Sequence, residues 1–403
     1  MPTVVLLGTL DTKGLEYAFL RDRVREHGVE VVLVDAGIMG EPLAEPDIGR
    51  EEIAAAAGAD VGALAAAGDR GAAIETMARG AAEIVLRLHA EGRLDGIAGL
   101  GGSGGSALVT HAMRALPVGV PKLMVSTVAS GDTRPYVGAT DVTMTYSVVD
   151  ISGVNRISAR IMANAAGAIA GMAKATVPAA DGDRPLIGAT MFGVTTPCVT
   201  RARERLEELG YEVLVFHATG TGGESMEALA RGGFLAGVLD ATTTELADDL
   251  VGGVLSAGPD RLEAAGELGL PQVVSVGAVD MVNFGPLETV PPGFRDRNLY
   301  VHNPTVTLMR TTPEECGELG RRIGSKLAAA KGPTALFVPL RGVSMIATEG
   351  GVFHDPDADE ALFAGLRETV GDVEAHWLEL DVNDDAFAVA MADRLHELVQ
   401  GRA

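Results

Sequence analysis

The chain has few cysteines, and this scarcity excludes two classes of protein. Cys198 and Cys316 are the only two among 403 residues. A disulfide scaffold needs several cysteines, and a structural zinc site needs closely spaced Cys or His pairs, which this sequence lacks. The fold must therefore be held together by its apolar core.

Long apolar runs are also missing. No stretch of eighteen or more apolar residues is present, so no segment is predicted to span a membrane. The N-terminal "MPTVVLLGTLDTKG" has too short an apolar run for a signal peptide and no basic region before it. We therefore expect a cytoplasmic protein.

Aromatic and basic residues are scarce as well. Aromatics make up 4% of the chain against 47% hydrophobic residues in total, so the cores are expected to consist of Val, Leu, Ile and Ala. With 32 basic and 55 acidic residues the formal net charge is -23, and we expect neither a nucleic-acid nor a membrane partner. A nucleotide can still bind locally, because glycine loops and helix N-termini supply their own positive potential.

Short β-branched runs alternate with helical patterns along the chain. This βα rhythm predicts a parallel sheet covered by helices on both faces. In the first half, strands are predicted at 3–8, 29–37, 94–102, in the first part of 119–133 and within 139–150, and helices at 13–28, 51–92 with a break near Gly68, and 155–175.

The segment 176–185 contains Pro, Gly and Asp without periodicity and is the best linker candidate. After it the same rhythm starts again. We therefore predict an α/β protein of two Rossmann-like doubly wound domains, at 1–180 and 181–403, with a cleft between them. The segment 291–312 is predicted to be a long irregular loop of the kind that is often functional.

Four unusual segments of the first half follow predicted strands. The carboxyl ends of parallel strands meet at one edge of the sheet, where ligands bind, so we expect these segments to converge. They are residues 8–14 ("GTLDTKG"), Asp35, residues 101–106 ("GGSGGS") and residues 126–133 ("STVASGDT").

The stretch "GLGGSGGSALVTHAMR" at 99–114 runs from a strand into a helix and contains five glycines. Backbone amides of such a loop can converge on one anion, and the helix N-terminus adds its own unpaired amides. Ser103 and Ser106 add hydroxyl groups. We predict a phosphate here; the alternative is a loop kept small for helix–sheet packing.

Lys13 is one of five lysines in the chain and stands beside Asp11 and Thr12 at a helix start. Lys13 is predicted to meet a phosphate, and Asp11 or Thr12 to hold magnesium or to cap the helix. Because the glycine follows the lysine, this is not a Walker P-loop. The alternative is a plain helix cap with a surface lysine.

Asp35 ends the second predicted strand. An acid at this position often accepts the ribose hydroxyls of a nucleotide. Gly8, which ends the first strand, is not part of a G-x-G-x-x-G pattern, so a classical NAD site is not expected. The alternative for Asp35 is a turn residue.

The second half has a second glycine nest at 217–223, within "FHATGTGGESM". If they surround one cleft, its candidate residues would do acid–base work on a phosphorylated or carboxylated metabolite. A loop histidine is, however, more often a structural group, and no known catalytic motif specifies a reaction. The candidates are His217, His302, Asp240, Asp280 and Arg341.

Six segments, taken in order, resemble the Tm-one-like ATP-binding domain family. They are "LGTLDTKGLEYAFLRD", "GLGGSGG", "VSTVASGDTRPYVG", "FHATGTGG", "SVGAVDMVNFG" and "LYVHNPTVTLMRTTPEE". The match runs from Thr3 to about Leu398. The resemblance implies two Rossmann-like subdomains, binding of ATP or a related nucleotide with magnesium, and self-association as a homodimer or higher homo-oligomer.

The resemblance also implies a set of nucleotide contacts, which coincides with the strand-end segments. Gly8 and Asp35 join this set on the strand-end argument alone. The implied contacts are Thr9, Asp11, Thr12, Lys13, Gly101, Gly102, Ser103, Gly104, Gly105, Ser106, Ser126, Thr127, Ser130, Gly131, Asp132 and Thr133.

The sequence therefore predicts a nucleotide-binding protein, either regulatory or a weak ATPase, whose N-terminal glycine loops hold the phosphates of ATP. One alternative is a cytoplasmic enzyme acting on a small anionic metabolite in the interdomain cleft. Another is an interaction protein that uses the small-residue face of the helix at 155–175 to bind a second subunit.

Overall fold

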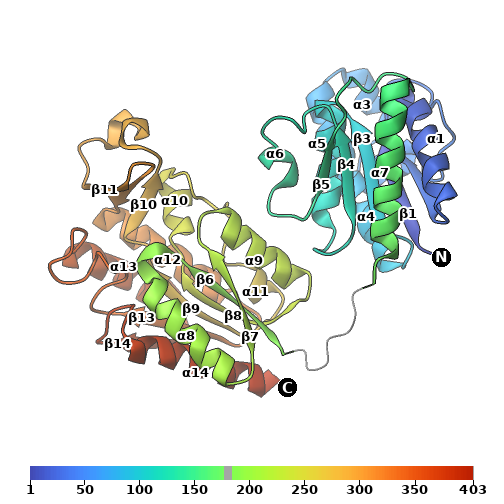
Figure 1. The fold of residues 1–403 in the computed structure, drawn as a ribbon. Helices are drawn as coiled ribbons and strands as arrows, with labels where there is room; N and C mark the ends of the chain where they lie inside the picture. Colours follow the sequence, from blue (N-terminus) through green and yellow to red (C-terminus); the bar gives the residue numbers. More distant parts are fainter. Residues whose placement is uncertain (177–183, 403) are drawn as a thin grey trace. The chain divides into compact units, whose positions relative to one another are not determined.

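The computed structural model describes residues 1–176 and 184–402. The chain divides into two compact units, residues 1–179 and 180–403, and each is described by itself (Figure 1). Both units are α/β with a parallel sheet, which confirms the predicted fold class. Most of the predicted linker at 176–185 lies outside the described residues.

The N-terminal sheet has the strand order β2-β1-β3-β4-β5, and all its neighbouring strands are parallel. The chain begins in the middle of this sheet, so the winding direction changes between β1 and β3. In open α/β sheets such a change marks the crevice where ligands bind. The strands are β1 (Thr3–Gly8), β2 (Glu30–Asp35), β3 (Gly96–Gly101), β4 (Lys122–Ser126) and β5 (Thr143–Tyr146).

Helices cover both faces of this sheet, as the βα rhythm requires. One core cluster joins α4 and α5 to the sheet, and the other joins α1 and α7 to it. Ala165, Ala166 and Ala170 of α7 are buried in the second cluster, so the small-residue face is already used inside the unit. The helices are α1 (Leu10–Glu26), α2 (Arg50–Ala56), α3 (Val61–Ala67), α4 (Arg70–Ala90), α5 (Ser103–Ala115), α6 (Arg134–Val137) and α7 (Arg156–Lys174).

The C-terminal sheet repeats this topology. Its order is β14-β13-β9-β8-β6-β7, so the first strand β6 again lies between the second and the third, and all pairs are parallel. The equivalent crevice lies between β6 and β8. The strands are β6 (Leu186–Met191), β7 (Glu212–His217), β8 (Leu235–Thr242), β9 (Gln272–Gly277), β13 (Thr334–Pro339) and β14 (Glu374–Leu378).

Seven α-helices and three short 3₁₀ turns complete the described part of the C-terminal unit. Helices α8 and α14 share one core cluster with the sheet, and α10, α12 and α13 share another. The helices are α8 (Thr196–Glu208), α9 (Thr221–Arg231), α10 (Glu245–Val251), α11 (Ala264–Glu267), α12 (Pro313–Ala328), α13 (Pro356–Thr369) and α14 (Asp385–Arg402), and the 3₁₀ turns are Gly193–Thr195, Leu287–Thr289 and Pro292–Phe294.

The prediction of a long irregular loop at 291–312 is wrong. Strands β11 (Leu299–Asn303) and β12 (Val306–Arg310) occupy most of it and form an antiparallel sheet with β10 (Met281–Phe284). The two-residue turn between β11 and β12 is held by Asn303, whose side chain accepts hydrogen bonds from the amide and hydroxyl of Thr305. The β-branched residues on both sides of this turn are typical of a β-hairpin, but the proline at 304 argued against strands in this segment.

Across the described ranges, the structure has no helix that is long and apolar enough to cross a membrane.

Candidate functional site

The crevice of the N-terminal unit is opened by a tyrosine. Pairing between β1 and β3 extends only to Leu6 and Ala98. Beyond that point the hydroxyl of Tyr17 lies between the strands: it donates to the Leu7 carbonyl at 2.5 Å and accepts from the Leu100 amide at 2.8 Å. A single buried side chain therefore satisfies both strands where they separate.

Gly8 leaves the space that the Tyr17 hydroxyl group occupies. A Cβ at Gly8 would lie 2.0 Å from the Tyr17 hydroxyl oxygen, so no larger residue fits. Gly8 does not line the pocket described next. Sequence reasoning missed Tyr17, because its helical spacing marks it only as a core residue.

A pocket of about 360 Å³ lies at the carboxyl ends of β1, β2 and β3. Five of the predicted contacts line it, namely Thr9, Asp11, Thr12, Gly104 and Gly105. The remaining lining residues are mainly aliphatic and include a segment between α3 and α4 that the sequence did not point to. They are Ala36, Ile38, Met39, Leu64, Ala65, Gly68, Asp69, Arg70, Ala73, Ile74, Met77 and Leu108.

The N-terminus of α5 faces this pocket. Gly102 caps the helix without a side-chain hydrogen bond, and the first intrahelical bond runs from the Ser106 amide to the Gly102 carbonyl at 2.8 Å. The amides of the first turn, residues 103–105, therefore have no acceptor within the helix. A Cβ at Gly104 would lie 3.1 Å from Cδ1 of Ile74, so a larger side chain would protrude into the pocket.

Asp11 is half used. Its Oδ2 accepts hydrogen bonds from the amides of Ile38 at 3.1 Å and Met39 at 2.8 Å, which ties the loop after β2 to the start of α1. Its Oδ1 is buried and has no hydrogen-bond partner among the described residues. A buried acceptor left without a partner costs about 1–3 kcal/mol, so this oxygen is a ready place for a ligand donor or cation.

Lys13 and Asp35 have partners inside the protein and do not line the pocket. The Lys13 ammonium donates to the Ile151 carbonyl. Asp35 is 1% exposed and forms an ion pair with Arg50 at 2.7 Å. Its Oδ1 also accepts from the amides of Leu10 and Gly37, both at 2.9 Å. Asp35 thus fixes the turns after β1 and β2, as the turn-residue alternative requires.

The loop after β4 also lies apart from the pocket lining. The Ser106 and Ser126 hydroxyls are fully buried and 2.7 Å apart, which ties α5 to the end of β4. Asp132 is exposed and pairs with Arg134 at 3.0 Å. The other predicted contacts outside the lining are Gly101, Gly102, Ser103, Thr127, Ser130, Gly131 and Thr133.

The pocket has little capacity to hold a metal by itself. Within residues 1–176 and 184–402, no group of three or more His, Cys, Asp or Glu residues is arranged around a common point. Magnesium at Asp11 stays a prediction, one that depends on a ligand supplying further oxygens.

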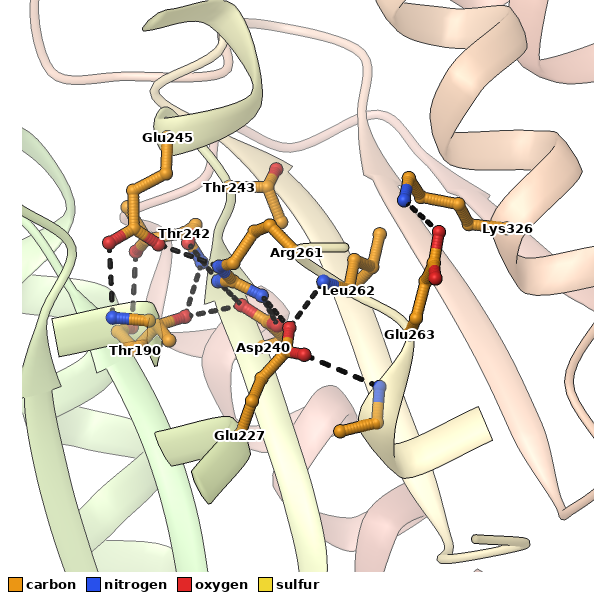
Figure 2. Close-up of polar contacts among 12 residues, drawn as sticks. Thr190, Glu227, Asp240, Thr242, Thr243, Glu245, Arg261, Leu262, Glu263 and Lys326 are labelled. Carbon is orange, nitrogen blue, oxygen red and sulfur yellow. Dashed lines mark hydrogen bonds and ion pairs between the residues drawn. The ribbon is translucent and has the colours of Figure 1, made fainter. Parts of the chain in front are cut away.

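The equivalent crevice of the C-terminal unit is filled by the protein's own ion pairs (Figure 2). The Thr190 hydroxyl donates to Asp240 at 2.7 Å and accepts from the Thr242 amide at 3.0 Å, which bridges β6 and β8. Arg261, 1% exposed, forms two hydrogen bonds with the Asp240 carboxylate at 2.5 and 2.7 Å. Its Nε donates to Glu245 at 2.6 Å.

The second glycine nest does bind an anion, but that anion is Glu245. The Oε1 of Glu245 accepts from the amides of Gly220 at 2.7 Å and Gly223 at 3.0 Å. A Cβ at Gly223 would lie 2.2 Å from the other carboxylate oxygen, so the glycine is needed for this contact. Burial raises the pKa of Glu245, and Arg261 opposes that shift.

The five acid–base candidates do not form one site. Asp240 is held by Arg261, and Asp280 is buried, accepts from the Ser344 hydroxyl at 2.8 Å and has a pKa raised by burial to about 6. The exposed ring of His217 is bonded to the Met191 carbonyl.

Strand order separates two of these candidates directly. His217 ends β7 and Arg341 follows β13, and the four strand spacings between β7 and β13 correspond to ~19 Å. Arg341 is exposed and pairs with Glu379 at 3.4 Å. His302 lies exposed on β11. Within the described residues, no hydrogen bond or ion pair joins any two of the five candidates.

Comparison with known families shows that nearly the whole chain matches one family. Residues 2–178 match the N-terminal domain, and residues 184–399 the C-terminal domain, of the uncharacterised protein family UPF0261. The chain belongs to this family. It is 55% identical over 399 residues to a UPF0261 protein of Clostridium tetani, which covers 98% of this chain and 99% of that relative.

A plant relative confirms the expected relationship to Tm-one-like proteins, whereas ATP binding stays a prediction. The ToMV resistance protein Tm-1(GCR237) of Solanum lycopersicum is 40% identical over 430 residues, which cover 98% of this chain and 56% of the tomato protein. This chain thus corresponds to about half of its plant relative. The UPF0261 protein of Rhizobium meliloti is 49% identical over 394 residues, which cover 97% of each chain.

Solved structures with a detectable likeness are remote. A UDP-N-acetylglucosamine 2-epimerase from Rickettsia bellii is 12% identical, with 68% of this chain and 78% of that one covered and a TM-score of 0.25. The MurG of Acinetobacter baumannii is 11% identical, with 100% and 98% covered and a TM-score of 0.22. A likeness at this level does not identify a ligand.

Proposed function

We propose that this UPF0261 protein binds ATP or a related nucleotide in the N-terminal pocket, with the phosphates at the N-terminus of α5. The observation that carries the proposal is the pocket at the β1–β3 crevice, where unpaired helix amides face an aliphatic wall. Its volume of about 360 Å³ lies in the range of small-molecule sites.

Each part of a nucleotide finds suitable chemistry in this pocket. Ile38, Leu64 and Met77 offer an apolar wall for a base. The amides of the first turn of α5 and the hydroxyls of Thr9 and Thr12 are donors for phosphate oxygens. Magnesium, which binds nucleotides through phosphates and one or two carboxylates, would use the free oxygen of Asp11.

The same lining favours binding over fast hydrolysis. Asp11, Asp69 and Arg70 are its only titratable residues. Asp11 accepts two amide hydrogen bonds, and Asp69 caps α4 by accepting from the Ala72 amide at 3.0 Å. Neither carboxylate is set up as a general base, so we infer a regulatory nucleotide site or a weak ATPase. The metabolite-enzyme alternative has lost its main support, because Glu245 fills the second nest.

Calorimetric titration of the full chain with ATP, ADP and AMP, each with and without magnesium, tests the proposal. We expect affinity to fall as phosphates are removed. Gly104→Val should weaken ATP binding at least ten-fold, because its side chain enters the pocket beside Ile74. Gly171→Val is the matched control, since Gly171 is an exposed helical glycine of the same unit with open space around it.

Two results would reject the proposal. One is wild-type protein that binds none of the three nucleotides. The other is Gly104→Val protein with wild-type affinity, provided that both glycine variants retain the wild-type circular dichroism spectrum and melting curve.

A further inference from the structure

The segment from Gly58 to Arg70, here called the lid segment, lies against the pocket yet contains no buried residue. It consists of α3, the turns on either side and Arg70, the first residue of α4. Leu64 and Ala65 of α3 line the pocket, together with the last three residues of the segment, Gly68, Asp69 and Arg70. Only Val61 and Leu64 pack, partly buried, against the core cluster. Few buried contacts mean that moving this segment costs little free energy.

The lid segment begins at one left-handed glycine and has another at the end of its helix. Gly58 has φ +70° and Gly68 has φ +67°, and a Cβ at either position would meet no atom within 4 Å. Asp60 caps α3 by accepting from the Ala63 amide at 2.9 Å. Because Asp69 caps α4 separately, the lid segment up to Gly68 can move without disrupting α4, to which Asp69 and Arg70 are fixed.

Arg70 is the single basic residue of the lid segment, and its guanidinium faces the start of α5. Its Nη2 lies 3.6 Å from where a Cβ of Gly104 would be. The guanidinium makes no hydrogen bond or ion pair with any residue that the structure describes. Several other arginines of this unit are paired, such as Arg50 with Asp35 and Arg87 with Glu52, but Arg25, Arg156 and Arg160 likewise form no side-chain hydrogen bond or ion pair with a described residue.

A bound anion would stabilise this pair of positive charges. The N-terminus of α5 carries a partial positive charge, and a guanidinium beside it adds a second positive charge. Arg70 differs from these other arginines in its place, because it lines the pocket beside the start of α5, and this position points to an anion from outside the protein. Arginine also matches the geometry of phosphate oxygens with two parallel hydrogen bonds.

We propose that the lid segment closes over the bound nucleotide and that Arg70 contacts its outer phosphates. Arg70 is then the residue that makes the pocket prefer a polyphosphate to a monophosphate. This inference rests on the proposed function, and it adds a residue and a movement that the nucleotide site itself does not require.

The test compares the wild type with Arg70→Gln and with Arg79→Gln, which removes an exposed arginine from the same helix, α4. Arg79 pairs with Glu75 at 3.1 Å on the surface and does not line the pocket, so its loss is expected to be silent. Affinities for ATP and AMP are measured by calorimetry. Protection of the amides of 61–67 is measured by hydrogen exchange with and without ATP.

We expect Arg70→Gln to weaken ATP binding about ten-fold or more while changing AMP binding little, so that the preference for ATP falls. Saturating ATP should slow exchange at 61–67 in the wild type and in Arg79→Gln, and much less in Arg70→Gln. These results together support the lid and its arginine.

The possible negative results can be told apart. Wild-type binding of ATP with unchanged affinity in Arg70→Gln overturns the role of Arg70 and leaves the nucleotide site standing. Binding without any change in exchange at 61–67 overturns the closing movement. Wild-type protein that binds neither ATP nor AMP overturns the proposed function and this inference with it.

Discussion

The buried ion cluster of the C-terminal unit allows a sharp stability prediction. Arg261→Met replaces the guanidinium by an unbranched apolar side chain in the same space. Asp240 and Glu245, which contact Arg261, have side chains that are 2% and 0% exposed, and Glu227 lies 3.5 Å away. All three carboxylates then remain buried without their shared cation.

The expected loss follows from this geometry. Removing one partner of a buried ion pair typically costs about 3–5 kcal/mol, since the remaining charge is left uncompensated. Here one arginine serves three carboxylates, so we expect the free energy of unfolding to fall by at least about 3 kcal/mol at pH 8.

The loss should also depend on pH. Burial already raises the pKa values of Glu227 and Glu245, and Arg261 is the main group that lowers them again. Without Arg261 the folded variant binds protons more tightly than the unfolded chain does. Its deficit is therefore largest above these folded-state pKa values and shrinks as the pH falls toward the unfolded value of about 4.3.

Trp377 makes the measurement selective. It is the single tryptophan of the chain and lies on β14, so its fluorescence during urea unfolding reports on the C-terminal unit. Arg205→Met is the control, because Arg205 pairs on the surface with Asp393 and Glu208, and such pairs contribute about 1 kcal/mol or less. Equal losses for the two variants, or a loss that does not shrink between pH 8 and pH 5, would refute the reasoning.

Three further predictions use other parts of the structure. Tyr17→Phe should destabilise the N-terminal unit by about 1–3 kcal/mol, because the Leu7 carbonyl and the Leu100 amide lose their shared partner; faster hydrogen exchange in β1 and β3 would reveal this loss, and unchanged exchange would contradict it. Glu245→Ala should empty the second glycine nest, so that sulfate raises the unfolding midpoint of the variant more than that of the wild type; equal responses would show that the nest cannot take a free anion. Burial raises the pKa of Asp248 to about 7, so wild-type stability followed by Trp377 fluorescence should fall as the pH rises from 6 to 8, with a smaller fall in Asp248→Asn; equal slopes would count against this assignment.

Local patterns in the sequence were enough to predict the two parallel sheets, although not the antiparallel sheet of β10, β11 and β12. Runs of β-branched residues and helical periodicity are set by residues close together in the sequence. They correctly predicted two α/β units, each with a parallel sheet. Strand-end position likewise predicted that Thr9, Asp11, Thr12, Gly104 and Gly105 face one pocket, since parallel strands bring their carboxyl ends together. The nest at 217–223 was predicted to hold an anion, and it holds the Glu245 carboxylate in place of the predicted metabolite.

Tertiary structure alone decided what occupies each crevice. Glu245 reaches the nest across the crevice, whereas the N-terminal crevice is held open by Tyr17 and lined on one side by residues of the lid segment, Arg70 among them. Asp35 likewise forms an ion pair with Arg50 of the protein itself. Periodicity and motifs describe the backbone of a loop but not which distant side chain packs into it. The sequence therefore determined where an anion can be held, and long-range packing determined whether the protein supplies that anion itself.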